Sequence, residues 1–251
     1  MWCKLMEKPN VIIYKVKSGL KEGIRASFYT WHGEKPPEDL EALRPIREEI
    51  HPWINFVWWD NPAPGVPSEF FAVRWRGFIY IPRTGEYRFY LTTDDGSRLW
   101  INDQLIIDAW RDQPPSTYVS EPLTLEAGYH RIKYYHYNRY AFAEAVLGWI
   151  PPFGEPGVIP REYFKHPASE TIKFTGLPDE YEIELVNKFG SRKCTPKARE
   201  CTINVKLEEM PLMAKLKIID KTSGEVIHES PGEIEFWGGD EIKVIIGIVK
   251  A

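Results

Sequence analysis

The sequence predicts an all-β protein made of two β-sandwiches, and three observations lead to this fold class. Apolar residues fall on every second position in many short runs, which is the period of a strand with one buried face. Clusters of Gly, Pro, Asn and Asp separate these runs. Aromatic residues make up 14% of the 251 residues and hydrophobic residues 43%, which suits one large or two medium cores between sheets.

The first expected strands lie before residue 60. Residues 11–16 form a β-branched apolar run, which predicts either a strand of its own domain or an arm that pairs with a neighbouring sheet edge. A proline-containing surface insertion with a short helix at 38–43 is expected within 33–52. Trp58 and Trp59 end the next strand, and they cannot both face one side of a sheet because successive side chains alternate.

The most regular alternation lies at 71–101. Residues 84–85 interrupt it, so two antiparallel strands are expected, and the acidic turn at 94–96 ends the second of them. Asn and Asp at 102–103 tolerate the left-handed backbone of a hairpin turn into the next strand. The alternating residues are Val73, Trp75, Tyr87, Phe89 and Leu91.

Further strands are expected up to residue 164. Residues 123–129 read as a strand and a turn, 130–137 as a long strand, and 146–150 as its successor after a loop at 138–142. A linker is expected at 166–169.

Together these residues resemble the PA-fourteen domain, a family named for the anthrax toxin protective antigen and shared with yeast flocculins and many glycosidases. The resemblance covers about residues 19–164 and lies in four motifs in the right order. It implies an antiparallel β-sandwich that binds glycans in many members and does so through calcium in some. The motifs are Arg-Trp-x-Gly at 74–77, Gly-x-Tyr-x-Phe at 85–89, Asp-Asp-Gly-x-x-Leu-Trp-Ile at 94–101 and Ala-Gly-x-His-x-Ile-Lys at 127–133.

The resemblance also implies a calcium site at Asp94 and Asp95. Consecutive carboxylates of an ordinary strand point to opposite faces, so these two can share an ion only across a cis peptide bond. Calcium takes six to eight oxygen ligands, so more donors are needed. The flocculin-type members supply an amide oxygen at the place of Asn138, and backbone carbonyls at Tyr140 and Phe142 would complete the shell.

Each of these site residues also has a purely structural interpretation. Asp-Asp-Gly is a good turn sequence without any ligand, and the loop after Asn138 is bulkier than a flocculin pocket would allow. Candidates for ring contacts with a sugar are Trp58, Trp59, Trp110 and Tyr140, with packing in the core as the alternative.

Residues 170–251 show their own alternation, with roughly seven short strands separated by turn signals, which is typical of an immunoglobulin-like sandwich. Cys194 and Cys201 flank an expected hairpin loop, so a disulfide is predicted that stabilises by about 2 kcal/mol through loop closure. Two reduced thiols are the alternative. The bond would indicate an oxidising compartment or a hyperthermophilic source. Cys3 has no evident partner.

Composition and motifs argue against several classes of function. A net charge of −4 offers no basic field for nucleic acid, and no apolar run approaches the ~20 residues of a membrane span. Adjacent aspartates lack the separation of about 5–9 Å between glycosidase carboxylates. Phosphate-loop, nucleophile-elbow and zinc-protease motifs are absent from the sequence, and the lone histidines are expected at the surface or in turns.

The sequence therefore predicts a PA-fourteen-like sandwich at 1–167 and a smaller immunoglobulin-like sandwich at 168–251. The expected function is that of a non-catalytic, extracellular, calcium-dependent carbohydrate-binding or adhesion module whose partner is a glycan or cell-surface polysaccharide. The alternative is a structural subunit of a surface layer or filament that self-assembles through its β edges and the 11–16 arm. An accessory module of a larger enzyme is a third interpretation. A leader peptide is not visible at the N-terminus, which leaves the compartment open.

Overall fold

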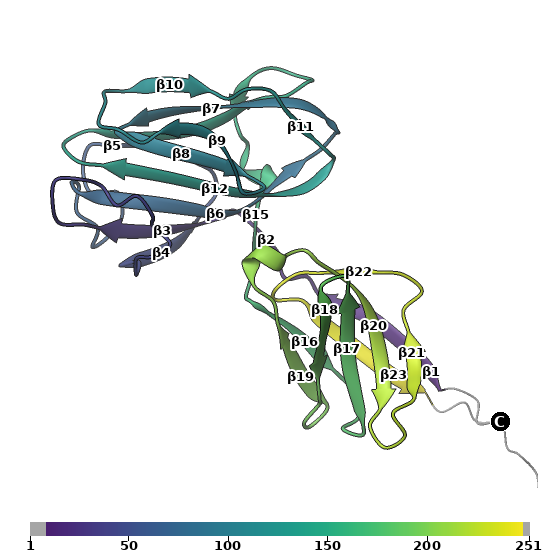
Figure 1. Ribbon diagram of the computed structural model, residues 1–251. Helices are drawn as coiled ribbons and strands as arrows, with labels where there is room; N and C mark the ends of the chain where they lie inside the picture. Colours follow the sequence, from purple (N-terminus) through teal and green to yellow (C-terminus); the bar gives the residue numbers. More distant parts are fainter. Residues whose placement is uncertain (1–8, 248–251) are drawn as a thin grey trace, which may run out of the picture. The chain divides into compact units, whose positions relative to one another are not determined.

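The computed structural model describes residues 9–247, and it consists of β-strands with two short 3-10 helices in that range (Figure 1). The chain divides into a large unit, Glu22–His166, and a small unit that combines Met1–Lys21 with Pro167–Ala251. The all-β class predicted from the sequence is confirmed. No helix in the described range is long and apolar enough to cross a membrane.

One sheet of the large unit has eight strands in the order β2-β15-β6-β12-β8-β9, with β3 paired to β6 and β4 to β3. The long strands β6 and β12 pair antiparallel over their whole length, with Asn138 opposite Phe71. The end of β12 therefore lies beside the start of β6. The strands are β2 (Leu20–Glu22), β3 (Ile24–Thr30), β4 (Arg47–His51), β6 (Phe71–Ile81), β8 (Gly96–Ile101), β9 (Gln104–Ala109), β12 (Gly128–Asn138) and β15 (Phe164–Pro167).

The other sheet of the large unit has the order β10-β7-β13-β14, with β11 on β7 and β5 on β13. A 3-10 helix, Arg161–Tyr163, precedes β15. The alternation predicted for 85–94 is present, because Tyr87, Phe89 and Leu91 are fully buried between the sheets. The strands are β5 (Asn55–Trp58), β7 (Gly85–Asp94), β10 (Ser116–Val119), β11 (Leu123–Leu125), β13 (Ala143–Ile150) and β14 (Gly157–Val158).

Trp75 is a centre of the core of the large unit. Its indole is fully buried and stacks with the rings of Trp58 and Tyr134, whose centroids lie 6.4 and 5.3 Å away. The indole N–H donates to Nδ1 of His51 at 3.0 Å, so the buried polar atom is satisfied. Burial lowers the pKa of His51, although nearby Glu49 opposes this shift, so the imidazole stays a neutral acceptor at pH 7.

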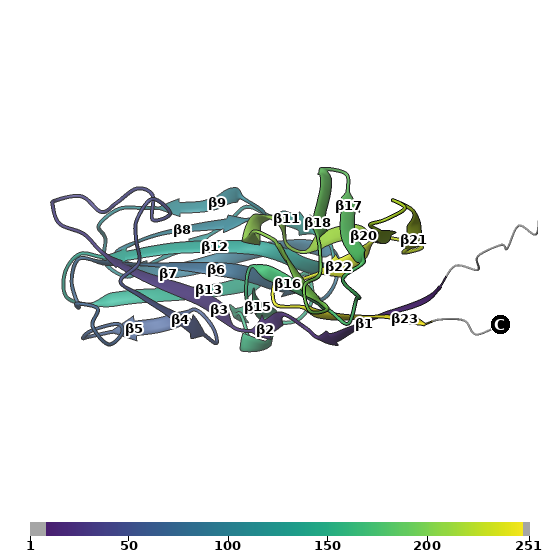
Figure 2. The ribbon, with the colours of Figure 1, turned by 90° about the horizontal axis from the view of Figure 1, so that it is seen from below.

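The small unit is a sandwich of two sheets, ordered β1-β23-β16-β19 and β18-β17-β20-β21, with β22 paired to β20 (Figures 1 and 2). Alternating apolar residues of β17 and β20 pair across the second sheet, with Ile183 opposite Ile218. A 3-10 helix, Leu207–Glu209, precedes β20. The strands are β1 (Asn10–Lys17), β16 (Thr171–Thr175), β17 (Tyr181–Asn187), β18 (Gly190–Cys194), β19 (Glu200–Asn204), β20 (Leu212–Asp220), β21 (Val226–Glu229), β22 (Ile234–Phe236) and β23 (Glu241–Gly247).

The N-terminal strand lies in the small unit, whereas the sequence placed it in a first domain of residues 1–167. β1 pairs antiparallel with β23, with Asn10 opposite Gly247, so it lies in the small unit. The large unit is therefore an insertion between two segments of the small one. This pairing joins residues more than 200 positions apart, and neither strand carries a local signal of its partner.

Two other expectations have structural outcomes in the described range. Residues 38–43 form turns and not a helix, because Leu40 is fully buried in a cluster with Tyr29 and Tyr135 and anchors an irregular segment. Cys194 and Cys201 form the expected disulfide, with their Cα atoms 5.8 Å apart. The bond joins β18 to β19 and thereby links the two sheets of the small unit. Cys3 lies outside the described residues.

Asp240 ties together the segments of the small unit that lead to and from the large unit. Its carboxylate is fully buried, and Oδ1 accepts the N–H of Gly19 at 2.7 Å while Oδ2 accepts that of Trp237 at 2.8 Å. The Nζ of Lys15 lies 2.6 Å from the same Oδ2. The N–H of Ala168 donates to the carbonyl of Gly19 at 2.7 Å, so the outgoing and returning segments meet there.

The backbone is packed so closely at this junction that side chains do not fit. A Cβ added to Gly19 would lie 2.3 Å from the carbonyl oxygen of Gly238. A Cβ on Gly238 would lie 1.9 Å from the carbonyl oxygen of Ser169. Glycine is therefore required at both positions for steric reasons.

Candidate functional site

Three strand ends meet around the acidic turn predicted from the sequence. β7 ends at Asp94, β8 begins at Gly96 and β12 ends at Asn138. The peptide bond between Asp94 and Asp95 is cis. A Cβ on Gly96 would lie 2.2 Å from the ring of Tyr137, so the turn packs directly against β12.

Asp95 is held by the backbone on both sides. The side chain is buried, Oδ1 accepts the N–H of Gln113 at 3.1 Å and Oδ2 accepts that of Arg139 at 2.8 Å. These two bonds fix the carboxylate between the loop that follows β12 and the segment that connects β9 to β10. Sequence reasoning identified Asp95 but not Gln113 and Arg139, because backbone donors leave no signature in residue type.

Asn138 presents a buried acceptor without a partner among the described residues. It is fully buried, and its Nδ2 donates to the carbonyls of Ser68 at 3.0 Å and Ala141 at 3.3 Å. These two bonds determine which way the amide faces, and they leave Oδ1 without a hydrogen bond. Buried polar atoms are nearly always satisfied, so this oxygen is suited to a cation or a ligand hydroxyl.

The pKa values of both carboxyl groups at the acidic turn are raised. Burial, then the charge of Asp95, then that of Glu144 raise the pKa of Asp94 to about 6. Burial also raises the pKa of Asp95, although the N–H groups of Arg139 and Gln113 oppose the shift. A bound cation would stabilise the ionised form of both carboxylates.

The donor set fits calcium better than a transition metal. No three His, Cys, Asp or Glu side chains gather into a metal cluster anywhere in residues 9–247. Two carboxylates and one amide oxygen are hard ligands, which calcium combines with backbone carbonyls. The loop that would add carbonyls at Tyr140 and Phe142 turns at Ala141, which has φ 57°.

The four aromatic candidates fall into different environments. Trp58 is a core residue and is not available to a ligand, because it is buried in the stack with Trp75. Trp110 is half-buried, edge-on to Tyr137 at 4.7 Å between ring centroids, beneath the guanidinium of Arg98.

Trp59 and Tyr140 are the two exposed candidates. Trp59 is 81% exposed and contacts the ring of Phe142 at 4.6 Å, and Tyr140 is 55% exposed and contacts Phe70 at 5.0 Å. Phe142 and Tyr140 both belong to the loop that follows Asn138. Trp59 therefore packs against the loop that follows Asn138, and Tyr140 is a part of this loop. Trp58 lies in the core instead.

A buried polar network supports the turn from within the sandwich. The hydroxyl of Thr93 donates to the carbonyl of Asp95 at 2.9 Å, and it lies 2.7 Å from the hydroxyl of Ser97. The hydroxyl of Ser97 in turn donates to the hydroxyl of Tyr134 at 2.9 Å. His136 joins this network through Nδ1, and burial lowers its pKa to about 3. The expectation of a surface or turn histidine is wrong for His136, because even positions of β12 face the core, and it is also wrong for the buried His51 and His166.

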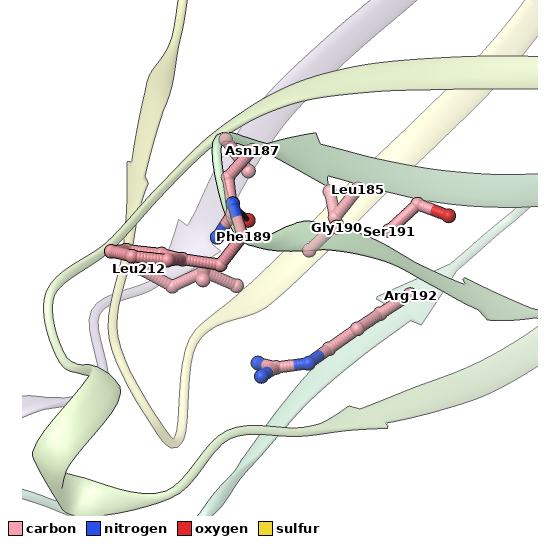
Figure 3. A pocket seen from close by; sticks show the side chains of 8 residues that line it. Leu185, Asn187, Phe189, Gly190, Ser191, Arg192 and Leu212 are labelled. Carbon is pink, nitrogen blue, oxygen red and sulfur yellow. Dashed lines mark hydrogen bonds between the residues drawn. The ribbon is translucent and has the colours of Figure 1, made fainter.

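A separate hollow lies on the β17–β18 hairpin of the small unit (Figure 3). It has a volume of about 190 Å³, and Phe189 at the hairpin tip is 86% exposed. Figure 3 shows the guanidinium of Arg192 extending below the hairpin, where it pairs with the carboxylate of Glu209. This hollow belongs to the small unit, whereas the acidic turn belongs to the large unit. Its lining residues are Leu185, Asn187, Phe189, Gly190, Ser191, Arg192, Leu212 and Ala214.

Comparisons with known proteins found a matching domain family and a similar protein. The profile of the PA14 domain matches residues 20–163. A stretch of 185 residues is 34% identical to the anti-sigma-I factor RsgI3 of Acetivibrio thermocellus, and the match covers 70% of this chain but only 27% of that protein.

Two solved structures are also similar. One is an anti-sigma factor domain-containing protein from Clostridium clariflavum, with 29% identity, a TM-score of 0.51, and coverage of 60% of this chain and 49% of that one. The other is a PA14 sugar-binding domain from an RTX adhesin, with 15% identity, a TM-score of 0.50, and coverage of 58% and 98%. At 15% identity the second similarity shows the fold alone.

These relatives overturn the function expected from the sequence. An adhesion module was predicted, with a self-assembling surface-layer or filament subunit as its alternative, and both are wrong. RsgI3 is named as an anti-sigma-I factor, and the Clostridium clariflavum protein is named as an anti-sigma factor domain-containing protein. The sequence motifs of the sandwich identify the domain but not the kind of protein that carries it.

Proposed function

Because this chain belongs to the PA14 domain family, we propose that it is the non-catalytic, carbohydrate-recognising part of an anti-sigma-type regulatory protein. The match to RsgI3 supports the regulatory class, and the name of the RTX adhesin domain supports a sugar as the ligand of the PA14 fold. The proposal assigns recognition of a polysaccharide, and not binding of a sigma factor, to this chain. It also places the chain outside the cytoplasm, which the disulfide between Cys194 and Cys201 supports.

The buried oxygen of Asn138 without a partner is the observation that carries the proposal. It lies on the residue before Arg139, whose N–H donates to the Asp95 carboxylate, which supports a site that combines this amide oxygen with the carboxylates of Asp94 and Asp95. We infer that Asp94, Asp95 and Asn138 hold one calcium ion, with backbone carbonyls at Tyr140 and Phe142 as further ligands. The bound ion would neutralise the carboxylates and offer open coordination positions to sugar hydroxyls.

Calcium is expected to raise the melting temperature of the protein. At a concentration one hundred times the dissociation constant, binding stabilises the folded state by about 2.7 kcal/mol, and hence by roughly 5–10 °C for a unit of this size. The shift should disappear with a chelator and in Asp95→Ala, because that change removes a carboxylate ligand. Glu121→Ala, an exposed acid on the same unit, is the matched control. Equal shifts in both variants would rule out a calcium site at this turn.

Calcium binding is also expected to weaken in mild acid. The pKa of Asp94 is about 6 in the folded protein without an ion, and the ligand must be ionised. The apparent affinity should therefore be constant above about pH 7 and fall about tenfold per pH unit below 6, as one proton competes with the ion. Titration calorimetry at pH 5.0, 6.0 and 7.5 measures this dependence.

The same raised pKa has the opposite effect on the stability of the ion-free protein. Between pH 6 and the ordinary carboxyl pKa of 3.8, the folded state holds a proton on Asp94 that the unfolded chain has lost. Asp94 therefore destabilises the fold above pH 6, and this contribution disappears as the pH falls. In the calorimetric titration, by contrast, a calcium affinity independent of pH would show that Asp94 is not a ligand.

A further inference from the structure

We propose that the open pocket between the end of β3 and the start of β6 is a second sugar subsite, which binds a neutral oligosaccharide next to the candidate calcium centre. This inference rests on the proposed function and extends it to the class of ligand. The cavity has a volume of about 370 Å³, which is within the range of small-ligand sites. Its lining residues are Thr30, Trp31, His32, Gly33, Pro67, Glu69 and Phe70.

The segment 67–70 connects this pocket to the acidic turn. The carbonyl of Ser68 accepts the Nδ2 of Asn138, and the N–H of Phe70 donates to the carbonyl of Arg139 at 3.2 Å. The carboxylate of Glu69 accepts the N–H of Ala141 at 3.3 Å. The same short segment therefore contacts residues 138–141 and also lines the pocket, which places the pocket next to the candidate calcium centre.

The pocket offers the two kinds of surface that a sugar ring uses. The rings of Trp31 and Phe70 pack edge-on at 5.6 Å and form an apolar wall, which suits the C–H face of a sugar. The exposed side chains of His32 and Glu69 offer hydrogen-bond partners for hydroxyl groups. Phe70 has φ 52°, an unusual conformation for a bulky residue that tends to occur at ligand sites.

Charge favours a neutral ligand over an acidic one. None of the seven lining residues is Lys or Arg, and Glu69 adds a negative charge to the wall. A uronic acid unit in this pocket would meet like charge, whereas a neutral hexose or pentose would not.

The test uses oligosaccharide ladders of one to six units in the presence of calcium. The neutral ladders are β-1,4-linked gluco- and xylo-oligosaccharides, and the acidic ladder is oligogalacturonides. Calorimetry and ligand-observed NMR compare the wild type with His32→Ala, Phe70→Leu and Val119→Ser, a control for an exposed apolar residue elsewhere on the large unit. For one neutral ladder, we expect affinity to rise at least tenfold from one unit to three in the wild type and in the control.

His32→Ala should lose that gain while binding calcium and the single sugar unit as the wild type does, and Phe70→Leu should lose the gain as well. An undiminished gain in both variants, or no gain in the wild type, overturns the subsite and leaves the calcium centre standing. Tighter binding of the acidic ladder overturns the neutral ligand class. If no ladder binds while calcium still raises the melting temperature, both the subsite and the carbohydrate function are refuted.

Discussion

Asp240→Ala is expected to lower the stability of the small unit by about 3–5 kcal/mol. The substitution leaves the N–H groups of Gly19 and Trp237 buried without acceptors, at about 1–3 kcal/mol each, and removes the partner of Lys15. Because the contacts of Asp240 are close to where the chain leaves and re-enters the small unit, the effect should be largest in β1, β16 and β23.

Hydrogen exchange measured by mass spectrometry separates this effect from changes in the large unit. Protection should fall in the small unit and stay unchanged in the core strands β6 and β12. Glu233→Ala, an exposed acid in the small unit, is the matched control and should shift stability by less than about 0.5 kcal/mol. A loss of the same size in both variants would mean that the buried carboxylate is not the source of the stability.

Trp75→Ala is expected to destabilise the large unit by about 3–5 kcal/mol, because it leaves a cavity in the aromatic stack with Trp58 and Tyr134. It also removes the indole N–H that satisfies His51. Urea unfolding of both variants, followed by far-ultraviolet circular dichroism, compares this change with Trp53→Ala, which removes an exposed indole from the same unit. Similar midpoints for the two variants would contradict the central position of Trp75.

Much of the large unit could be predicted from the sequence because its strands carry a clear period of two. The run at 71–101 alternates around Trp75 and Phe89, and the structure buries both residues. The acidic turn was also visible, since Asp94 and Asp95 belong to a recognisable motif. Asn138 was identified through the family resemblance and not from the strand pattern alone.

The rest depends on contacts that local sequence does not encode. Alternation predicts that one of Trp58 and Trp59 is buried, but the register of β5 against β13 decides which one, and it places Ala143 opposite Trp58. The pocket beside Phe70 is formed by loops from two distant strands, so no single run of residues predicts it. The ladder between β1 and β23 is likewise a long-range pairing. The proposal of a regulatory protein rests on the relatives, because the strand pattern of a PA14 domain does not reveal the kind of protein that carries it.

The pairing of Asn10 with Gly247 has a mechanical consequence. In antiparallel neighbours the hydrogen bonds run across the strands. Tension applied between these two residues would therefore break the hydrogen bonds between β1 and β23 one pair at a time, beginning at this end of the ladder. The inserted large unit would lie outside that load path. Pulling on the large unit itself would instead transmit force through the contacts around Asp240, which gives the protein two different responses to stretching.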